Sequence, residues 1–264
     1  GFEALLPVDS QSRNAVSSWK DPRVGGWGAG TEACGVAPSG RTPVVFVHGN
    51  SMDASFWRTA DSGDGTIVDV RRRFLAAGYC PEDLWAVSYT GAAGYTTYND
   101  VNTGDVRGFV AAVRQWTGAA QVDVVAHSLG VTVVRKAALV DPDFQASLRS
   151  FVAIAGANQG TTSCRGSGTL HVSHVCEETE PGSAWLAELN AGGQTPGTTR
   201  YLTIYEGSGF VDNFFLGPDA QSPRLDGACN HQMPGVAHNT LARGAAAVAT
   251  YLAFLRDGTL PACS

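Results

Sequence analysis

The segment Ala126-His-Ser-Leu-Gly130 has the residue types of a nucleophilic serine held in a tight turn. It follows an apolar run at 121–126 and precedes a helical pattern at 131–139. A serine on a sharp strand-to-helix turn needs small residues two positions away on each side, and Ala126 and Gly130 meet that need. Such a turn exposes Oγ and places it at the positive end of a helix, which favours an oxyanion nearby. We therefore predict that Ser128 is the nucleophile of a covalent acyl transfer.

A second motif, Val47-His-Gly-Asn50, directly follows another apolar run. In hydrolases with a serine on such a turn, one oxyanion donor is the backbone N–H after the nucleophile, and the other comes from a loop after an earlier strand. We expect Leu129 N–H and Asn50 N–H to be these donors, with Gly49 allowing a close approach of the backbone. His48 and His127 lie beside tight turns, so we expect both rings to bond to neighbouring loops.

The general base should follow the nucleophile in the chain, because the order in this arrangement is serine, acid, histidine. His238 lies in the loop Gly235-Val-Ala-His-Asn-Thr240, immediately before the last helical pattern, and it is the predicted base. His231 is the alternative. His171 and His174 come too early, between two cysteines and before the strand expected to precede the acid.

The acid should lie in the loop after the apolar run at 200–205, where it would fix the imidazole tautomer and stabilise the imidazolium. This loop offers four carboxylates, and we favour Asp212. Asp226 precedes a glycine, as in a turn, and Asp219 follows Gly217-Pro218, as in a solvated loop. Glu206 comes directly after the apolar run and remains a candidate.

The segments that must position these groups alternate between strand and helix patterns. Strands are predicted at 43–47, 83–89, 121–126, 148–154 and 200–205, and helices at 66–77, 105–116, 131–139 and 240–255. This alternation indicates an α/β fold of right-handed βαβ units, with a mostly parallel central sheet flanked by helices. Ligands of such sheets bind at the carboxyl ends of the strands, where the motifs fall.

Length and charge narrow the class of protein. A chain of 264 residues that is 44% hydrophobic can bury its own core, so we expect one domain over 1–264. A net charge of −6 with 18 Lys and Arg argues against nucleic acid and against docking on an anionic membrane. No apolar run approaches the ~18 residues of a transmembrane helix. Nothing requires more than a monomer.

The chain has six cysteines, with no Cys-x-x-Cys pair and no zinc-finger spacing. This pattern favours three disulfides and an oxidising compartment. The expected pairs are Cys34–Cys80, Cys164–Cys176 and Cys229–Cys263; the alternative is six buried free thiols in a cytosolic protein. The start GFEALLPVDS lacks the pattern of a targeting segment, so we expect a mature, secreted protein. We expect neither a metal nor an organic cofactor.

Five strings resemble a known family when taken in order: VVFVHGN, VDVVAHSLG, AIAGANQG, RLDGACN and GVAH. They are similar to the small secreted bacterial lipases of the class 2 lipase family, from about Thr42 to the final helix. PVVFVHGN and DVVAHSLGV are also similar to extracellular polyhydroxyalkanoate depolymerases. The resemblance implies an α/β-hydrolase fold in which Ser128, Asp212 and His238 act as nucleophile, acid and base. It also implies Asn50 and Leu129 as oxyanion donors.

The chain departs from the family pattern in three places. The loop that carries Asp212 is longer than in the smallest lipases. Residues 160–197 look like a loop-rich insertion near the active site, and residues 1–41, rich in Gly, Pro and Ser, look like an N-terminal wrap without a counterpart.

The predicted function is that of a secreted carboxylester hydrolase acting on hydrophobic esters. Apolar residues near the expected rim suit such a substrate, or a lipid or polymer interface, although Phe56 and Trp57 fit the core equally well: Met52, Phe56, Trp57, Phe210, Phe214, Phe215 and Leu216. A secreted polyester depolymerase is the main alternative. Peptidase, amidase and thioesterase activities, or a catalytically silent binding protein, are further alternatives.

Overall fold

Six parallel strands form the central sheet in the part of the chain that the computed structural model describes, residues 2–8, 40–58, 61–89, 98–166, 173–258, 260 and 263. The strand order is β2-β1-β3-β4-β5-β6. Because every neighbouring pair is parallel, the carboxyl ends of all six strands lie at the same edge of the sheet. The strands are β1 (Val44–Val47), β2 (Leu84–Val87), β3 (Val122–His127), β4 (Leu148–Ile154), β5 (Arg200–Tyr205) and β6 (Cys229–Gln232).

The apolar runs form strands because both faces of this sheet are covered. All four residues of β1 are fully buried. Val44 and Phe46 belong to one hydrophobic cluster, and Val45 and Val47 belong to the other. A strand buried on both faces reads as a continuous apolar run, with no alternation of polar residues.

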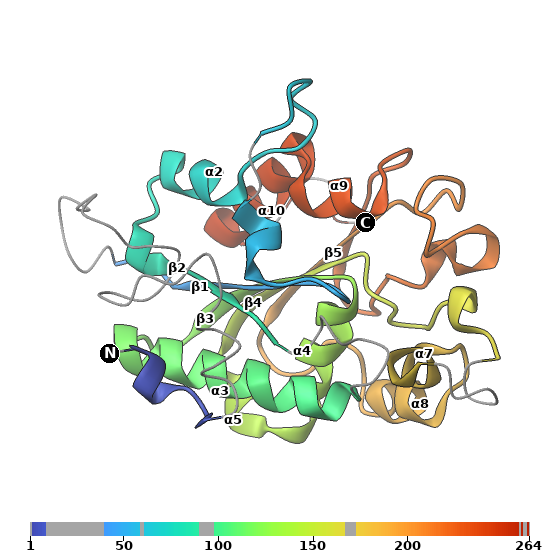
Figure 1. Ribbon diagram of the computed structural model, residues 1–264, viewed down its shortest axis with the longest axis horizontal. Coiled ribbons are helices and arrows are strands. Elements are labelled where there is room, and N and C mark those ends of the chain that lie inside the picture. Colours follow the sequence, from blue (N-terminus) through green and yellow to red (C-terminus); the bar gives the residue numbers. More distant parts are fainter. Residues whose placement is uncertain are drawn as a thin grey trace.

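Helices form a layer on each face of the sheet (Figure 1). On one face lie α3 (Asn99–Thr117), α4 (Leu129–Val140) and α5 (Pro142–Ser147), with α7 (His174–Thr179) and α8 (Ala184–Ala191) beside them. On the other face lie α2 (Val70–Ala76), α9 (His238–Arg243) and α10 (Ala245–Asp257). Short 3₁₀ turns are η1 (Phe2–Leu5), η2 (Ala54–Arg58), η3 (Pro81–Asp83), η5 (Thr162–Cys164) and η6 (Gly217–Gln221). The predicted α/β architecture is therefore confirmed.

Several elements differ from the sequence-based prediction: α3 begins at Asn99, before the predicted range 105–116, α2 begins at Val70 within the predicted range 66–77, and α5, α7 and α8 were not predicted. The predicted helix over 240–255 is two helices, and Gly244 between them has an extended backbone with ψ 143°. A Cβ at Gly244 would lie 2.6 Å from the carbonyl oxygen of Thr240, so the tight break requires glycine. The sixth strand, β6, was not predicted, because its residues CNHQ are polar and partly exposed at the edge of the sheet.

Two disulfides occur among the described residues, Cys164–Cys176 and Cys229–Cys263, and both are pairings expected from the sequence. The third expected pair involves Cys34, which lies outside the described residues. Most of the predicted 1–41 wrap also lies outside them. The predicted 160–197 insertion contributes η5, α7 and α8, and its description as an insertion stays a prediction.

No helix in the described ranges is both long and apolar enough to cross a bilayer.

Candidate active site

Ser128 occupies the turn between β3 and α4. Its backbone is strained, with φ 55° and ψ −124°, a conformation that residues other than glycine rarely adopt. Its N–H donates a 2.8 Å hydrogen bond to the carbonyl of Ile154 at the end of β4, which holds the turn against the sheet. A Cβ at Gly130 would lie 2.4 Å from the carbonyl oxygen of His48. The small residue two positions after the serine is thus required by the loop packed against the turn.

The loops after β5 and β6 bring a carboxylate and an imidazole together. Nδ1 of His238 lies 3.0 Å and 2.9 Å from the two carboxylate oxygens of Asp212, and both side chains are buried. A carboxylate at Nδ1 fixes the proton on that nitrogen and leaves the lone pair on Nε2. Asp212 also accepts a 3.0 Å bond from the N–H of Phe214, which anchors the carboxylate within its own loop. The pair has the geometry of an oriented general base.

His127 connects the serine turn to the histidine loop. Its Nε2 lies 3.2 Å from the carbonyl oxygen of His238, so this nitrogen carries the proton. Its ring stacks on Phe56 at 5.0 Å and lies 4.7 Å from the His238 ring. Burial lowers the pKa of His127 well below 6.5, so the ring is neutral. Since His127 directly precedes Ser128, these contacts place His238 beside the serine turn.

Among the described residues, no hydrogen bond joins Ser128 Oγ to the His238 ring. Catalytic hydrogen bonds in ligand-free sites are commonly long and tighten when substrate binds.

The loop after β1 packs against the nucleophile. A Cβ at Gly49 would lie 3.0 Å from Cβ of Ser128 and 3.3 Å from Nδ1 of His127. Asn50 follows, partly buried, and its side-chain oxygen is buried with no hydrogen-bond partner. Leu129 is the first residue of α4, where backbone N–H groups lack acceptors within the helix. Two loops that leave adjacent strands therefore meet at Ser128, each with a backbone N–H predicted to face an oxyanion.

The ring of His48 holds the loop after β1 in this position. Nδ1 donates to the carbonyl of Gly49 at 2.8 Å, and Nε2 accepts from the N–H of Tyr89 at 3.3 Å. The Tyr89 hydroxyl in turn donates to the carbonyl of His48 at 2.7 Å, and the two rings stack at 4.0 Å. Burial lowers the pKa of His48 to about 4, so the ring is neutral near pH 7. Tyr89 was not singled out from the sequence, since a tyrosine ending a strand carries no distinctive signal.

The remaining acids and histidines weighed from the sequence serve other contacts. Asp219 accepts bonds from the N–H and hydroxyl of Thr162, both at 2.6 Å. Asp226 is exposed, and Glu206 bonds to backbone N–H groups. His231 lies partly buried on β6. Of the four candidate acids, Asp212 alone bonds a histidine in the described part of the chain.

The predicted substrate-contacting residues divide into exposed and buried sets. Phe210 is 85% exposed, and Phe214 and Leu216 are each about half exposed, so the acid loop presents three apolar side chains to solvent within four residues of Asp212. Phe214 also lies 4.5 Å from the His238 ring, measured between ring centroids. Phe215 is buried, and Met52 is partly exposed and packs on the core.

Phe56 and Trp57 are both part of the core. Trp57 is fully buried, and Phe56 contacts the site through its stacking on His127.

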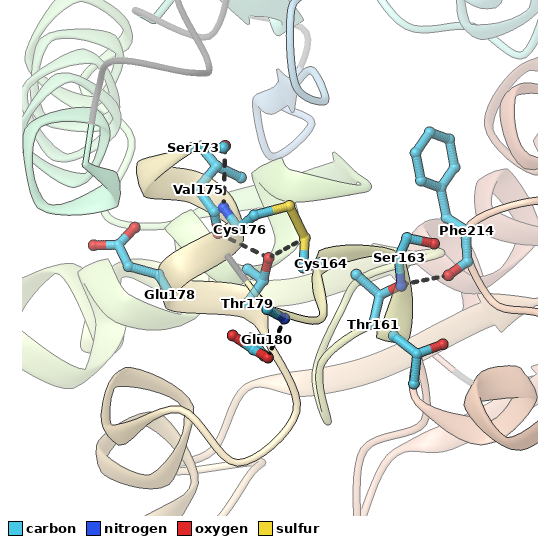
Figure 2. Close-up of a disulfide and its surroundings, with 12 residues drawn as sticks. Thr161, Ser163, Cys164, Ser173, Val175, Cys176, Glu178, Thr179, Glu180 and Phe214 are labelled. Atoms are coloured by element: carbon cyan, nitrogen blue, oxygen red, sulfur yellow. Dashed lines mark hydrogen bonds between the residues drawn. A yellow bond between two sulfur atoms is a disulfide. The ribbon is translucent and has the colours of Figure 1, made fainter. Parts of the chain in front are cut away.

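The chain immediately before the Cys164–Cys176 disulfide contacts the acid loop (Figure 2). Thr161, just before this disulfide, donates its hydroxyl to the carbonyl of Phe214 at 2.6 Å. Thr179 donates to Val175 within α7 and contacts the Cys164 sulfur, which ties η5 to α7. The Thr161–Phe214 bond joins residues far apart in the sequence, and connects the start of η5 to the loop that carries Asp212.

Within the described residues, no group of three or more His, Cys, Asp or Glu side chains is arranged to hold a metal ion.

Comparison with known proteins gives one family match. Residues 41–212 match the family model described as lipase (class 2). This range includes Ser128 and ends at Asp212, and His238 lies beyond it.

Three solved structures share the fold at low sequence identity. A Bacillus licheniformis lipase, BlEst2 in mature form, superposes with a TM-score of 0.64 at 14% identity, covering 84% of this chain and 94% of that one. Aspergillus fumigatus lipase B gives 0.64 at 17% identity, covering 83% of this chain and 53% of the fungal one. The phospholipase PlaB from Legionella pneumophila, in complex with thio-NAD, gives 0.58 at 16% identity, covering 83% and 58%. At such identities the likeness establishes the fold, that of an α/β-hydrolase.

Proposed function

This chain belongs to the class 2 lipase family, and from that premise we propose that it cleaves hydrophobic carboxylic esters through a Ser128-His238-Asp212 triad. Family membership makes it a lipolytic hydrolase of the carboxylic ester class. The observation that carries the triad is the buried Asp212–His238 pair, with both carboxylate oxygens within 3.0 Å of Nδ1, beside a serine in a strained turn.

The proposed reaction has two acyl-transfer steps. Ser128 Oγ attacks the ester carbonyl while Nε2 of His238 takes its proton, and Asp212 stabilises the imidazolium without taking the proton itself. Collapse of the tetrahedral intermediate breaks the bond to the alcohol, which leaves with the proton from His238. Water then attacks the acyl-enzyme by the same route and releases the carboxylic acid.

Two backbone N–H groups are the proposed stabilisers of the tetrahedral oxyanion. Those of Asn50 and Leu129 come from the two loops that meet at Ser128, and the contact between Gly49 and Ser128 keeps those loops together. Removal of one donor of this kind typically costs about 3–4 kcal/mol of transition-state stabilisation. The second N–H lies on the helix that follows the nucleophile, so its direction is fixed by α4.

The exposed apolar residues around Asp212 support a substrate presented at an interface. Phe210, Phe214 and Leu216 would contact an emulsion droplet or a polymer surface. The same surface supports the second candidate, a secreted depolymerase of hydrophobic polyesters. Clearing of polyhydroxybutyrate granules, measured beside hydrolysis of a triglyceride emulsion, distinguishes the two substrates. Secretion is supported by the two disulfides, which persist in oxidising compartments.

The test of the triad is the initial rate of p-nitrophenyl butyrate hydrolysis by the wild type and three variants. We expect Ser128→Ala and His238→Ala to lose activity, and Asp212→Asn to lose several orders of magnitude in kcat, since the wrong imidazole tautomer results. Asp226→Asn is the matched control and keeps its rate, because this carboxylate of the same loop is exposed. A Ser128→Ala protein with wild-type kcat would refute the proposal.

A further inference from the structure

Glu206 is a buried carboxylate at the start of the loop that leads from β5 to Asp212. Its oxygen Oε2 accepts from the N–H of Ser208 at 3.0 Å and from that of Gly209 at 2.9 Å. Its oxygen Oε1 accepts from the hydroxyl of Ser208 and, at 3.0 Å, from the N–H of Gly235. Four donors thus converge on one side chain.

The carboxylate is held as an anion by these donors. Burial raises the pKa of Glu206, but the hydrogen bonds from Ser208, Gly235 and Gly209 outweigh it, and the net pKa lies below 4.5. An ionised carboxylate only accepts hydrogen bonds, so in this form both oxygens are available to all four donors. Within the described residues, Glu206 has no Lys or Arg partner, so these donors alone compensate the buried charge.

The four donors belong to the two loops that carry the acid and the base. Ser208 and Gly209 lie a few residues before Asp212, and Gly235 lies three residues before His238. In the described structure, Met233 N–H also donates to the carbonyl of Tyr205 at the end of β5, at 2.7 Å, and beyond this strand end the two loops are joined by the Glu206–Gly235 bond and the Asp212–His238 pair. The buried carboxylate therefore fixes both loops to one point close to the end of β5.

We propose that Glu206 is a positioning residue that keeps Asp212 in register with His238, an inference that rests on the proposed triad. The side chain touches neither the serine nor the reacting atoms. Its effect is exerted through the relative position of two loops, whose displacement by about 1 Å would disrupt the Asp212–His238 pair. A purely structural carboxylate would affect the unfolding temperature and leave kcat unchanged.

The decisive variant is Glu206→Gln. The amide has nearly the same shape as the carboxylate, but one of its two polar groups is an NH₂, which cannot accept a hydrogen bond. The NH₂ group faces either the N–H groups of Ser208 and Gly209 or the N–H of Gly235, so the hydrogen bonds to one of the two loops are lost. We expect kcat for p-nitrophenyl butyrate to fall about 10- to 100-fold while KM stays within about twofold. Glu206→Asp keeps the charge on a side chain that is shorter by one methylene, and it should lower kcat less than Glu206→Gln does. This variant provides the test if Glu206→Gln does not fold.

A double variant separates positioning from a general weakening of the fold. In the Asp212→Asn background the proper acid is already missing, so adding Glu206→Gln should change kcat by less than about twofold. Glu178→Gln is the control for the same substitution at another buried glutamate, which accepts a 2.8 Å bond from the backbone N–H of Asn99, away from both loops, and whose pKa burial raises to about 7. It should keep the wild-type kcat.

The outcomes distinguish this inference from the proposed function. If Ser128→Ala is inactive but Glu206→Gln keeps the wild-type kcat, the role of Glu206 is refuted and the triad is retained. The role is equally refuted if the loss from Glu206→Gln persists in full when Asp212 is Asn. If Ser128→Ala is active, the proposed function fails first.

Discussion

Gly130→Ala tests the contact between the serine turn and the loop after β1. A Cβ at this position would lie 2.4 Å from the carbonyl oxygen of His48 and 3.0 Å from that of Val47. Carbon–oxygen contacts ordinarily begin near ~3.3 Å, so the loop or the helix must move by roughly 0.9 Å. Both contacted atoms belong to the backbone, so no side-chain rotation relieves the overlap.

We expect Gly130→Ala to lower kcat strongly while the protein stays folded. A shift of roughly 0.9 Å moves Asn50 N–H out of the narrow range in which a donor stabilises an oxyanion, and one donor is worth about 10²- to 10³-fold in kcat. We therefore expect kcat to fall about 100-fold or more. Overpacking at a buried site costs about 1–3 kcal/mol of unfolding free energy, which leaves the protein folded at 25 °C.

Two glycine variants control for the added methyl group. A Cβ at Gly104 in α3 meets nothing within 4 Å, so Gly104→Ala should keep kcat. A Cβ at Gly108 would lie 2.5 Å from Cγ of Pro7, so Gly108→Ala should lose stability and keep kcat. The assay is p-nitrophenyl butyrate hydrolysis together with thermal unfolding. A Gly130→Ala protein that is folded and within about threefold of the wild-type kcat would show that this contact does not position the oxyanion donor.

The other predictions concern pH and interfaces. The folded-state pKa of His48 is about 4 against an ordinary 6.5, so the unfolded chain takes up the proton first as the pH falls. Titration of His48 should therefore lower the free energy of unfolding by about 3 kcal/mol as the pH falls from 6.5 to 4, as measured by urea unfolding. In His48→Gln the free energy of unfolding should depend less steeply on pH over this range. An unchanged pH dependence in this variant would contradict the prediction. Phe210→Ser should keep the rate on soluble p-nitrophenyl butyrate but weaken adsorption to a tributyrin emulsion about 10-fold, since the exposed ring is lost. Val8 is exposed to a similar extent, and Val8→Ser should adsorb as the wild type does. Equal adsorption of the wild type and both variants would show that Phe210 does not contact the emulsion.

The fold was predictable from the sequence where burial or steric fit leaves a pattern in the local residue types. The run Pro43-Val-Val-Phe-Val47 reads as a strand because both faces of β1 are covered, and Ala126 to Gly130 reads as a turn because no side chain fits at Gly130. In contrast, β6 is visible only through its pairing with β5, since its polar residues have no strand pattern of their own. The break at Gly244 depends likewise on a contact with Thr240.

The candidate site was predictable for the residues whose chemistry is distinctive. Ser128 and His238 follow from motif and chain order, and the structure places Asp212 against His238. The role of Glu206 was not predictable, because it depends on the backbone of Gly235, which lies 29 residues away. Tyr89 is similar, since its bond to the carbonyl of His48 joins two loops that meet only in three dimensions.

The strand order has a geometric consequence for the length of the acid loop. Between β3, which ends at the serine turn, and β5, which precedes the acid, lies β4, which provides a carbonyl to Ser128 but no member of the proposed triad. Neighbouring strands lie about 4.8 Å apart, so the acid starts about 10 Å to the side of the nucleophile. Six residues separate Tyr205 from Asp212, enough extended chain to cross about 20 Å. About three extended residues would cross the offset of two strand spacings, so a deletion that leaves fewer than about three residues could not return the carboxylate toward the serine.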